Sequence, residues 1–220
     1  MVDSTLWIAE SDSQVVYHCD SALEGEEWHQ LCKGKWKLVS AGGIFVDCGS
    51  LWLCSESGRL YQTYPHSCSV MQEINPPNNL DILCLAASSE VLWLLLSSGE
   101  IFIREGISND CFAGKSWKPL DMEQISKKVI FQHLSIGLDS VWAVSKAGEV
   151  FVAIGSPFSM STAVFAPAWV HVESEIKMAK VNMLFRVSLI KTPNLQFCFF
   201  FNSPTFSEFS LLPSVDKQRI

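Results

Sequence analysis

A tryptophan motif recurs along the chain and constrains its fold more than any other feature. Each copy has a Trp, a Gly six residues later and an aromatic residue nine residues later. The copies are Trp52, Gly58 and Tyr61; Trp93, Gly99 and Phe102; and Trp142, Gly148 and Phe151. A looser copy starts at Trp7, with Ser13 in the glycine region and Tyr17 ten residues after the Trp. Internal similarity at a period of roughly 40–50 residues is typical of repeat architectures.

Each copy predicts a β-hairpin. An apolar strand carries the Trp, and the Gly in the polar turn that follows supplies the positive φ that a tight turn needs. The second strand then ends at the aromatic residue, and we expect the Trp and this residue near the two ends of adjacent strands, packed on the core side. A second tryptophan element lies between hairpins, because Gly34–Leu38 resembles Gly114–Leu120, and Trp169–Val172 is a third copy. A few short strands in a unit of this length predict a propeller blade.

The alternative is an ordinary β-sandwich with a chance tryptophan pattern, but three matched copies within residues 52–151 favour the repeat. The sequence therefore predicts an all-β chain, an incomplete β-propeller of about three to four blades over residues 1–172. Propellers typically need at least four blades to close a ring. We therefore expect this chain to be a fragment or a truncated product.

An irregular C-terminal tail is predicted over residues 173–220. Residues 181–220 contain seven of the 14 Phe but no Trp and no Gly. Only Val181–Ile190 has the composition of a strand. The tail is interpreted as non-native to the propeller, such as the product of a retained intron, and a divergent further blade is the alternative.

Composition and charge exclude several classes of protein. Of the 220 residues 48% are apolar and 18% charged, which excludes a disordered chain. The net charge of −7 gives no basic surface for nucleic acid. Residues 80–96, the longest apolar stretch, are interrupted by Asp81 and Glu90, so no transmembrane segment is predicted. Without a secretory leader, we expect a cytoplasmic protein whose eight cysteines are reduced.

No arrangement of residues predicts catalysis, a metal site or a cofactor. None of the five histidines stands at metal-ligand spacing from Cys, Asp or Glu. His18, Cys19 and Asp20 are contiguous, but neighbouring strand residues point to opposite faces. Nucleophile-elbow and phosphate-loop motifs are absent from the sequence.

Residues 91–120 resemble the tectonin β-propeller repeats. Trp93, Gly99, Arg104 and Trp117 occur there in the order of the family pattern, and Leu134–Val144 resembles the strand that leads to the next repeat. The other copies have Thr63 and Ala153 in place of the arginine, so their match is partial.

The resemblance implies a propeller of a family that favours six blades. The chain is most similar to the large animal members linked to autophagy. That likeness implies a non-enzymatic scaffold that binds ubiquitin-like autophagy modifiers and vesicle-tethering or coat machinery, and that reaches membranes through these partners. A lectin-like propeller is the alternative, because some tectonins bind carbohydrate or lipopolysaccharide. Trp28 and Trp117 would then stack on sugars.

A short segment resembles the peptide motif that docks on ubiquitin-like autophagy modifiers. Glu26 and Glu27 precede Trp28, and an aliphatic residue, Leu31, follows three positions after the Trp. Such a peptide adds a strand to the partner's sheet, where alternate pockets take the Trp and the Leu. The acids would meet basic residues at the rim. The alternative is that Trp28 packs over the edge of the propeller.

Overall fold

The computed structural model describes residues 6–9, 16–19, 29–42, 50–64, 67–77, 81–88, 90–108, 110–123, 125–126, 128–137, 140–154, 168–174 and 177–180. For residues 6–9, 16–19, 29–31 and 67–69 only the backbone is described.

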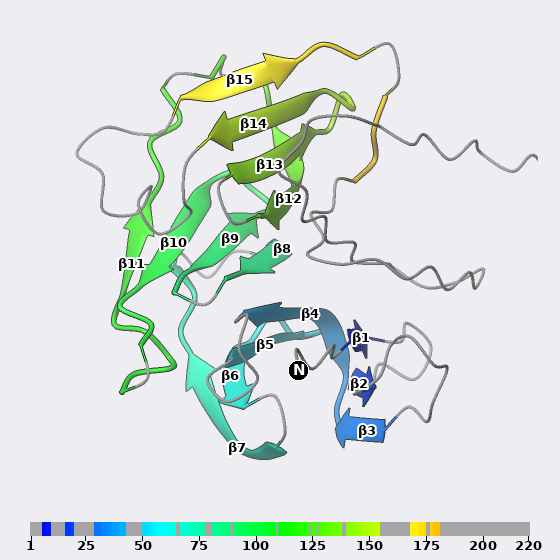
Figure 1. Cartoon of the computed structure of the whole chain (residues 1–220), viewed down its shortest axis with the longest axis vertical. Coiled ribbons are helices and arrows are strands. Elements are labelled where there is room, and N and C mark those ends of the chain that lie inside the picture. The colour runs from blue at the N-terminus through cyan, green and yellow to red at the C-terminus, as the bar shows by residue number, and fades with distance from the viewer. Residues whose placement is uncertain are drawn as a thin grey trace, which may run out of the picture.

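Four antiparallel sheets follow one another along the described parts of the chain (Figure 1). The first contains β1 (Leu6–Ala9), β2 (Val16–Cys19) and β3 (His29–Cys32). The second contains β4 (Trp36–Gly42), β5 (Ser50–Ser55), β6 (Leu60–Tyr64) and β7 (Ser67–Ile74). The third contains β8 (Ile82–Ala87), β9 (Leu92–Leu96), β10 (Ile101–Glu105) and β11 (Ser116–Pro119). The fourth contains β12 (Phe131–Ile136), β13 (Ser140–Ser145), β14 (Val150–Ile154) and β15 (Trp169–Val172).

The sheets stand around an arc, with their first strands at its centre (Figure 1). Strand β1 contacts β4, β4 contacts β8, and β8 contacts β12. Strands β3, β7, β11 and β15 lie on the outside. The fold is an all-β, incomplete propeller of three four-stranded blades and one three-stranded sheet over the described residues, as the sequence predicted. No described helix has the length and apolar character needed to cross a bilayer.

The hairpin turns contain the glycines of the repeat. Gly58, Gly99 and Gly148 have φ angles of 81°, 90° and 81°. At the middle turn, the Gly99 N–H donates to the Leu96 carbonyl at 2.9 Å, and the Leu96 N–H donates to the Glu100 carbonyl at 3.0 Å. The turns are therefore tight because glycine adopts this backbone without steric cost.

The aromatic residue of the repeat differs from expectation. Phe102 is the second residue of β10, not its end, and pairs with Leu94 instead of Trp93. Paired residues share a face, so Phe102 and Trp93 point to opposite sides of the sheet. Trp93 lies in the core between the third and fourth sheets, and Phe102 in the core between the second and third. The Trp of a blade thus packs forward along the chain, and the aromatic residue packs backward.

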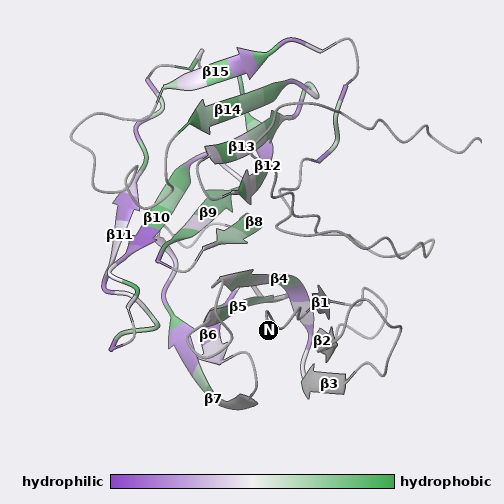
Figure 2. Cartoon of the chain, viewed as in Figure 1, coloured by the Kyte–Doolittle hydropathy of each residue, from purple (hydrophilic) through white to green (hydrophobic). Residues whose placement is uncertain are grey.

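Two apolar cores join the three four-stranded sheets. The core between the second and third sheets contains Trp52, Leu60, Leu85 and Leu94. The core between the third and fourth contains Trp93, Ile103, Phe131, Leu134 and Ala143. In Figure 2, β9 and β14 are largely hydrophobic, β10 is hydrophobic at its start, and the outer strand β11 is hydrophilic.

The cysteines differ in state. Cys32 is disulfide-bonded, against the expectation of reduced cysteines. Cys54, Cys84 and Cys111 are not disulfide-bonded, and the first two are buried. Sequence spacing does not anticipate such a bridge, because a disulfide depends on the distance and direction between two Cβ atoms in the fold.

Candidate functional site

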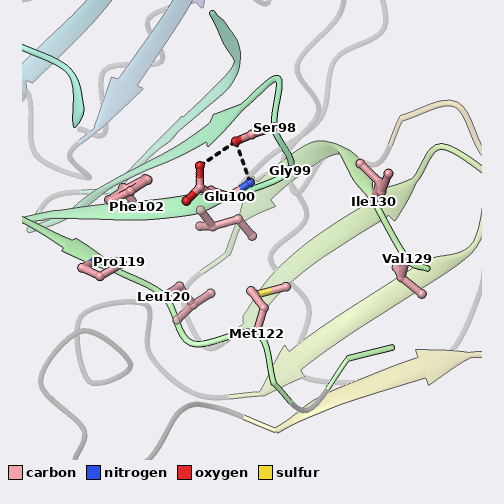
Figure 3. A pocket seen from close by; sticks show the side chains of 10 residues that line it. Ser98, Gly99, Glu100, Phe102, Pro119, Leu120, Met122, Val129 and Ile130 are labelled. Carbon is pink, nitrogen blue, oxygen red and sulfur yellow. Dashed lines mark hydrogen bonds between the residues drawn. The ribbon is translucent and has the colours of Figure 1, made fainter. Parts of the chain in front are cut away.

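An open pocket of about 370 Å³ lies where the third sheet meets the chain leading into the fourth (Figure 3). Its apolar walls come from Phe102 on β10, Leu120 at the end of β11, and Met122, Val129 and Ile130 ahead of β12. The Ile130 side chain is 40% exposed.

Local backbone contacts fix the pocket. The β9–β10 turn lies against the far wall, since a Cβ built on Gly99 would lie 3.2 Å from Cγ2 of Ile130. The Leu120 N–H donates to the Ile101 carbonyl at 2.8 Å and holds the end of β11 beside β10. The Val129 N–H donates to the Ser126 carbonyl at 2.8 Å and folds the following loop back. A side chain at position 99 would press on Ile130 and narrow the pocket.

Glu100 is the charged residue among those that line the pocket. The Ser98 hydroxyl donates to a carboxylate oxygen of Glu100 at 2.8 Å, which orients that carboxylate (Figure 3). Asp121 and Glu123 are exposed on the adjoining loop. No cluster of three or more potential metal ligands occurs among the described residues. Apolar walls with carboxylates at the rim suit an apolar side chain that is followed or preceded by a cation.

Arg104 braces the loop that connects β10 to β11. Its Nε donates to the Ala113 carbonyl at 2.9 Å, and Nη2 donates to the Gly114 carbonyl at 3.2 Å. The guanidinium carbon lies 5.2 Å from the centroid of Trp117. Burial lowers the pKa of Arg104, but a guanidinium remains charged at neutral pH. These contacts give the arginine a structural role.

Trp117 links two blades. Its Nε1 donates to the Asn75 carbonyl at 2.9 Å, across from the third sheet to the chain that follows β7. Nearby, the Tyr64 and Phe112 rings meet edge to face with centroids 5.2 Å apart. Both contacts tie the second sheet to the third at its outer edge.

Comparisons with known proteins agree with this arrangement. The sequence model of the Hyd_WA propeller family matches residues 91–120. Human tectonin beta-propeller repeat-containing protein 2 is 30% identical over 203 residues, which cover 88% of this chain. The repeats of this chain are similar to those of this tectonin propeller protein. The chain spans 14% of the length of that human relative.

A solved structure shares the fold. The crystal structure of human WBSCR16 superposes with a TM-score of 0.51 at 14% identity, over 76% of this chain and 50% of that one. YCF48 from Cyanidioschyzon merolae gives a TM-score of 0.49 at 12% identity, over 74% of this chain and 52% of that one.

The residues predicted to mark the tectonin repeats differ in burial. Trp52 and Trp93 are fully buried, and Trp142 is only half-buried. Phe102 and Phe151 are buried, and Tyr61 and Trp117 are half-buried. For Trp7, only the backbone is described.

The predicted docking motif lies mostly outside the described residues. Glu26, Glu27 and Trp28 are not described, and for Leu31, in strand β3, only the backbone is. Strand β3 is an edge strand of the first sheet as described, because the sheet order is β1-β2-β3. The structure does not bring this motif and the pocket together in any described contact.

The pocket was missed by sequence reasoning. Its lining comes from residues 98–102, 119, 120, 122, 129 and 130. Gly99 and Phe102 belong to the repeat motif, but the motif does not predict that these segments surround one pocket. Only the stacking of tectonin-type blades places them together. Trp117 was also predicted to stack on a sugar in a lectin-like propeller. Its Nε1 donates to the Asn75 carbonyl and its ring lies against the Arg104 guanidinium, so little of the ring is left to contact a glycan.

Proposed function

We propose that this chain is a non-enzymatic protein-interaction segment of a larger tectonin propeller protein, acting in autophagy or vesicle trafficking in the cytoplasm. The pocket beside the β9–β10 turn carries the proposal, because it offers apolar walls and an oriented carboxylate without a nucleophile–base pair or metal cluster among its described residues. The tectonin resemblance supplies the expected process, and the docking motif at Trp28 supplies a second contact.

The two contacts have different partners in this proposal. Trp28 and Leu31 dock on a ubiquitin-like autophagy modifier by adding a strand to its sheet. The pocket takes an apolar side chain with a neighbouring Lys or Arg from a tethering or coat protein, because Glu100 and the loop acids favour a cation there.

Modifier binding is tested with the purified full chain and a purified ubiquitin-like autophagy modifier on a biosensor. We expect binding that the double substitution Trp28→Ala and Leu31→Ala abolishes. Met122→Ser serves as the matched control, since it changes the pocket and leaves the motif intact. Binding that survives the double substitution would refute the motif.

Pocket binding is tested by NMR with chain labelled at the methionine methyl groups. A short peptide with Leu between two Arg residues should shift the Met122 signal, and a peptide with Leu between two Glu residues should not. Glu100→Gln should weaken the first response, whereas Glu56→Gln, at an exposed turn of the second sheet, should leave it unchanged. An equal response to both peptides would contradict the role of the carboxylate.

A further inference from the structure

The outer strand of the second sheet is longer than the other outer strands. Strand β7 has 8 residues, whereas β3, β11 and β15 have 4 each. It forms the edge of its sheet as described, because the strand order is β4-β5-β6-β7. Native proteins keep exposed edge strands short, since the unpaired backbone groups of an edge can bind another strand. Strand β7 thus offers an unusually long edge.

The composition of β7 also lacks the usual protection of an edge. Lysine and proline are residues that hinder the addition of a further strand. Strand β11 ends in Lys118 and Pro119, but Ser67–Ile74 contains neither residue type. Two of its large apolar side chains face solvent, because Val70 is 65% exposed and Met71 is 39% exposed. A long edge and an apolar surface therefore coincide on this strand.

A side-chain hydrogen bond shows which backbone groups of β7 point inward. The Thr63 hydroxyl donates to the Val70 carbonyl at 2.9 Å, so this carbonyl points toward β6. Carbonyls alternate in direction along a strand that pairs in the antiparallel manner. The Met71 carbonyl therefore points away from β6, and the Gln72 carbonyl points toward it.

The pairing of β6 gives the same assignment. The Ser55 N–H donates to the Arg59 carbonyl at 2.9 Å, so Arg59 turns its carbonyl toward β5. Three residues later along the alternation, Gln62 turns its backbone groups the other way, toward β7, where it pairs with Gln72. Gln72 therefore faces inward, which again leaves Met71 facing outward.

Met71 and Glu73, the two neighbours of Gln72, present their N–H and C=O groups at the open edge. Neither backbone has a hydrogen-bond partner beyond its sheet among the described residues. An extended chain beside β7 would pair with these groups, because strand residues two apart direct their backbone groups to the same side. The geometry of the edge thus selects an extended segment.

The side chains beside this edge set the chemistry of such a segment. Met71 and Glu73 stand at alternate positions, so an added strand would place alternate side chains against the thioether and the carboxylate. The Glu73 side chain is 49% exposed, and its Oε2 lies 3.8 Å from Nη1 of Arg59. An apolar residue and a Lys or Arg two positions away therefore suit the edge.

A second copy of this chain suits the edge less well. The chain carries a net charge of −7, so two copies repel each other. The one charged residue that a second β7 would bring is again Glu73, an acid. Charge complementarity favours a cationic partner instead.

We propose that β7 is a docking edge for an extended segment of a partner protein, in which an apolar residue faces Met71 and a Lys or Arg faces Glu73. The added strand pairs with the outward backbone groups of both residues and extends the second sheet on its outer side (Figure 1). This surface is separate from the pocket of the third sheet, so the proposal does not depend on the proposed function.

A designed peptide locates the docking edge. The probe is a short peptide that alternates Lys and Val, and the control peptide has Pro in place of its central Val residues. In the full chain labelled at the methionine methyl groups, the probe should shift the Met71 signal, and the control peptide should not. A shift at Met122, in the pocket, without a shift at Met71 would overturn the proposal.

Backbone variants test the pairing itself. Met71→Pro removes an outward N–H and should weaken binding of the probe on a biosensor about tenfold or more, whereas Met71→Thr keeps this N–H and should weaken it less than about threefold. Met71→Pro should leave the urea midpoint nearly unchanged, because proline is tolerated where the N–H of an edge strand faces solvent. Gln72→Pro should lower the midpoint. Equal affinity of the Pro and Thr variants at position 71 would overturn the proposal.

Charge variants make the test independent of any effect of proline on folding. Glu73→Lys should weaken the probe about threefold or more and should allow binding of a peptide that alternates Glu and Val. Glu90→Lys, at an exposed position ahead of β9, is the matched control and should change neither affinity. Unchanged affinity in Glu73→Lys would overturn the proposal.

Sedimentation equilibrium of the full chain tests the other occupant. We expect a monomer. A dimer that Met71→Pro dissociates would show that a second copy fills the edge, and would overturn the proposal of a cationic partner.

Discussion

The indole of Trp93 lacks a hydrogen bond that its counterparts have. Nε1 of Trp52 donates to the Ser50 hydroxyl at 3.0 Å, and Nε1 of Trp142 donates to Ser140 at 3.0 Å. In both blades the serine stands two residues before the Trp, on the same face of the strand. Val91 holds that position in the third sheet, and the buried Nε1 of Trp93 has no partner. Threonine at position 91 would keep the volume of valine and add an acceptor.

The expected effect is a balance of two terms. An unpaired buried N–H costs about 1–3 kcal/mol, and a buried hydroxyl without a partner costs a similar amount. In Val91→Thr the new hydroxyl would accept a hydrogen bond from Nε1 of Trp93, so neither group stays unpaired. We therefore expect the free energy of unfolding to change by less than about 0.5 kcal/mol or to rise by about 1 kcal/mol. Val141→Thr is the matched control: Val91 and Val141 are both 0% exposed in the same core, but the residue two positions after Val141 is Ala143 instead of a Trp. It should lose about 1–3 kcal/mol.

The assay is urea unfolding followed by far-ultraviolet circular dichroism, so that changes of tryptophan do not alter the signal. A double-mutant cycle with Trp93→Phe isolates the bond, because phenylalanine has no N–H to donate. We expect a coupling energy of about 1–2 kcal/mol between positions 91 and 93. If Val91→Thr cost as much as Val141→Thr, and the coupling were zero, the reasoning from the equivalent serines would be wrong.

Three further outcomes follow from other contacts. Gly42→Ala should lower stability by about 1–3 kcal/mol, because a Cβ there would collide with the Ser88 carbonyl oxygen between β4 and β8; an unchanged urea midpoint would contradict that close approach. Arg104→Ala should speed tryptic cleavage after Lys115, since the loop loses two hydrogen bonds from the guanidinium, and Arg104→Lys should restore little of this because it lacks the planar fork. Burial raises the pKa of the Cys54 thiol from 9.0 to about 11, so the unfolded thiol ionises first, and stability that is complete below pH 9 falls as the pH rises toward 11. Cys54→Ala should flatten unfolding midpoints across that range.

The repeat motif predicted the sheets because its spacing matches the number of residues in a strand, a turn and a second strand. It did not predict which way the side chains point. One residue of register decides that: Phe102 pairs with Leu94, next to Trp93, and a shift of one position moves a side chain to the other face. Register depends on the turn that Gly99 makes, and the number of residues between the Trp and the aromatic residue does not determine it.

The pocket and the disulfide were not predictable for a related reason. The pocket walls Phe102 and Ile130 are far apart in sequence and meet only because one blade stacks on another. Cys32 needs a partner in space rather than a spacing in sequence. Likewise, nothing in the period shows that Trp142 is less buried than Trp93, since burial is decided by whatever packs against the last described blade.

The two ends of the described stack of sheets present different kinds of surface. In each four-stranded sheet the Trp lies on the second strand, but Trp7 lies on β1, the first strand of its sheet, so the position that β4, β8 and β12 occupy has no counterpart among the described strands. Strand β1 is therefore an edge strand of the first sheet as described, where backbone groups can pair with another strand. The last sheet instead presents the half-buried Trp142 on the same face as the exposed Val170 and Ile154, which a packed sheet would bury. Because one end offers hydrogen bonds at a strand edge and the other offers an apolar face, a strand that paired with β1 and a sheet that covered Trp142 would not compete for one surface.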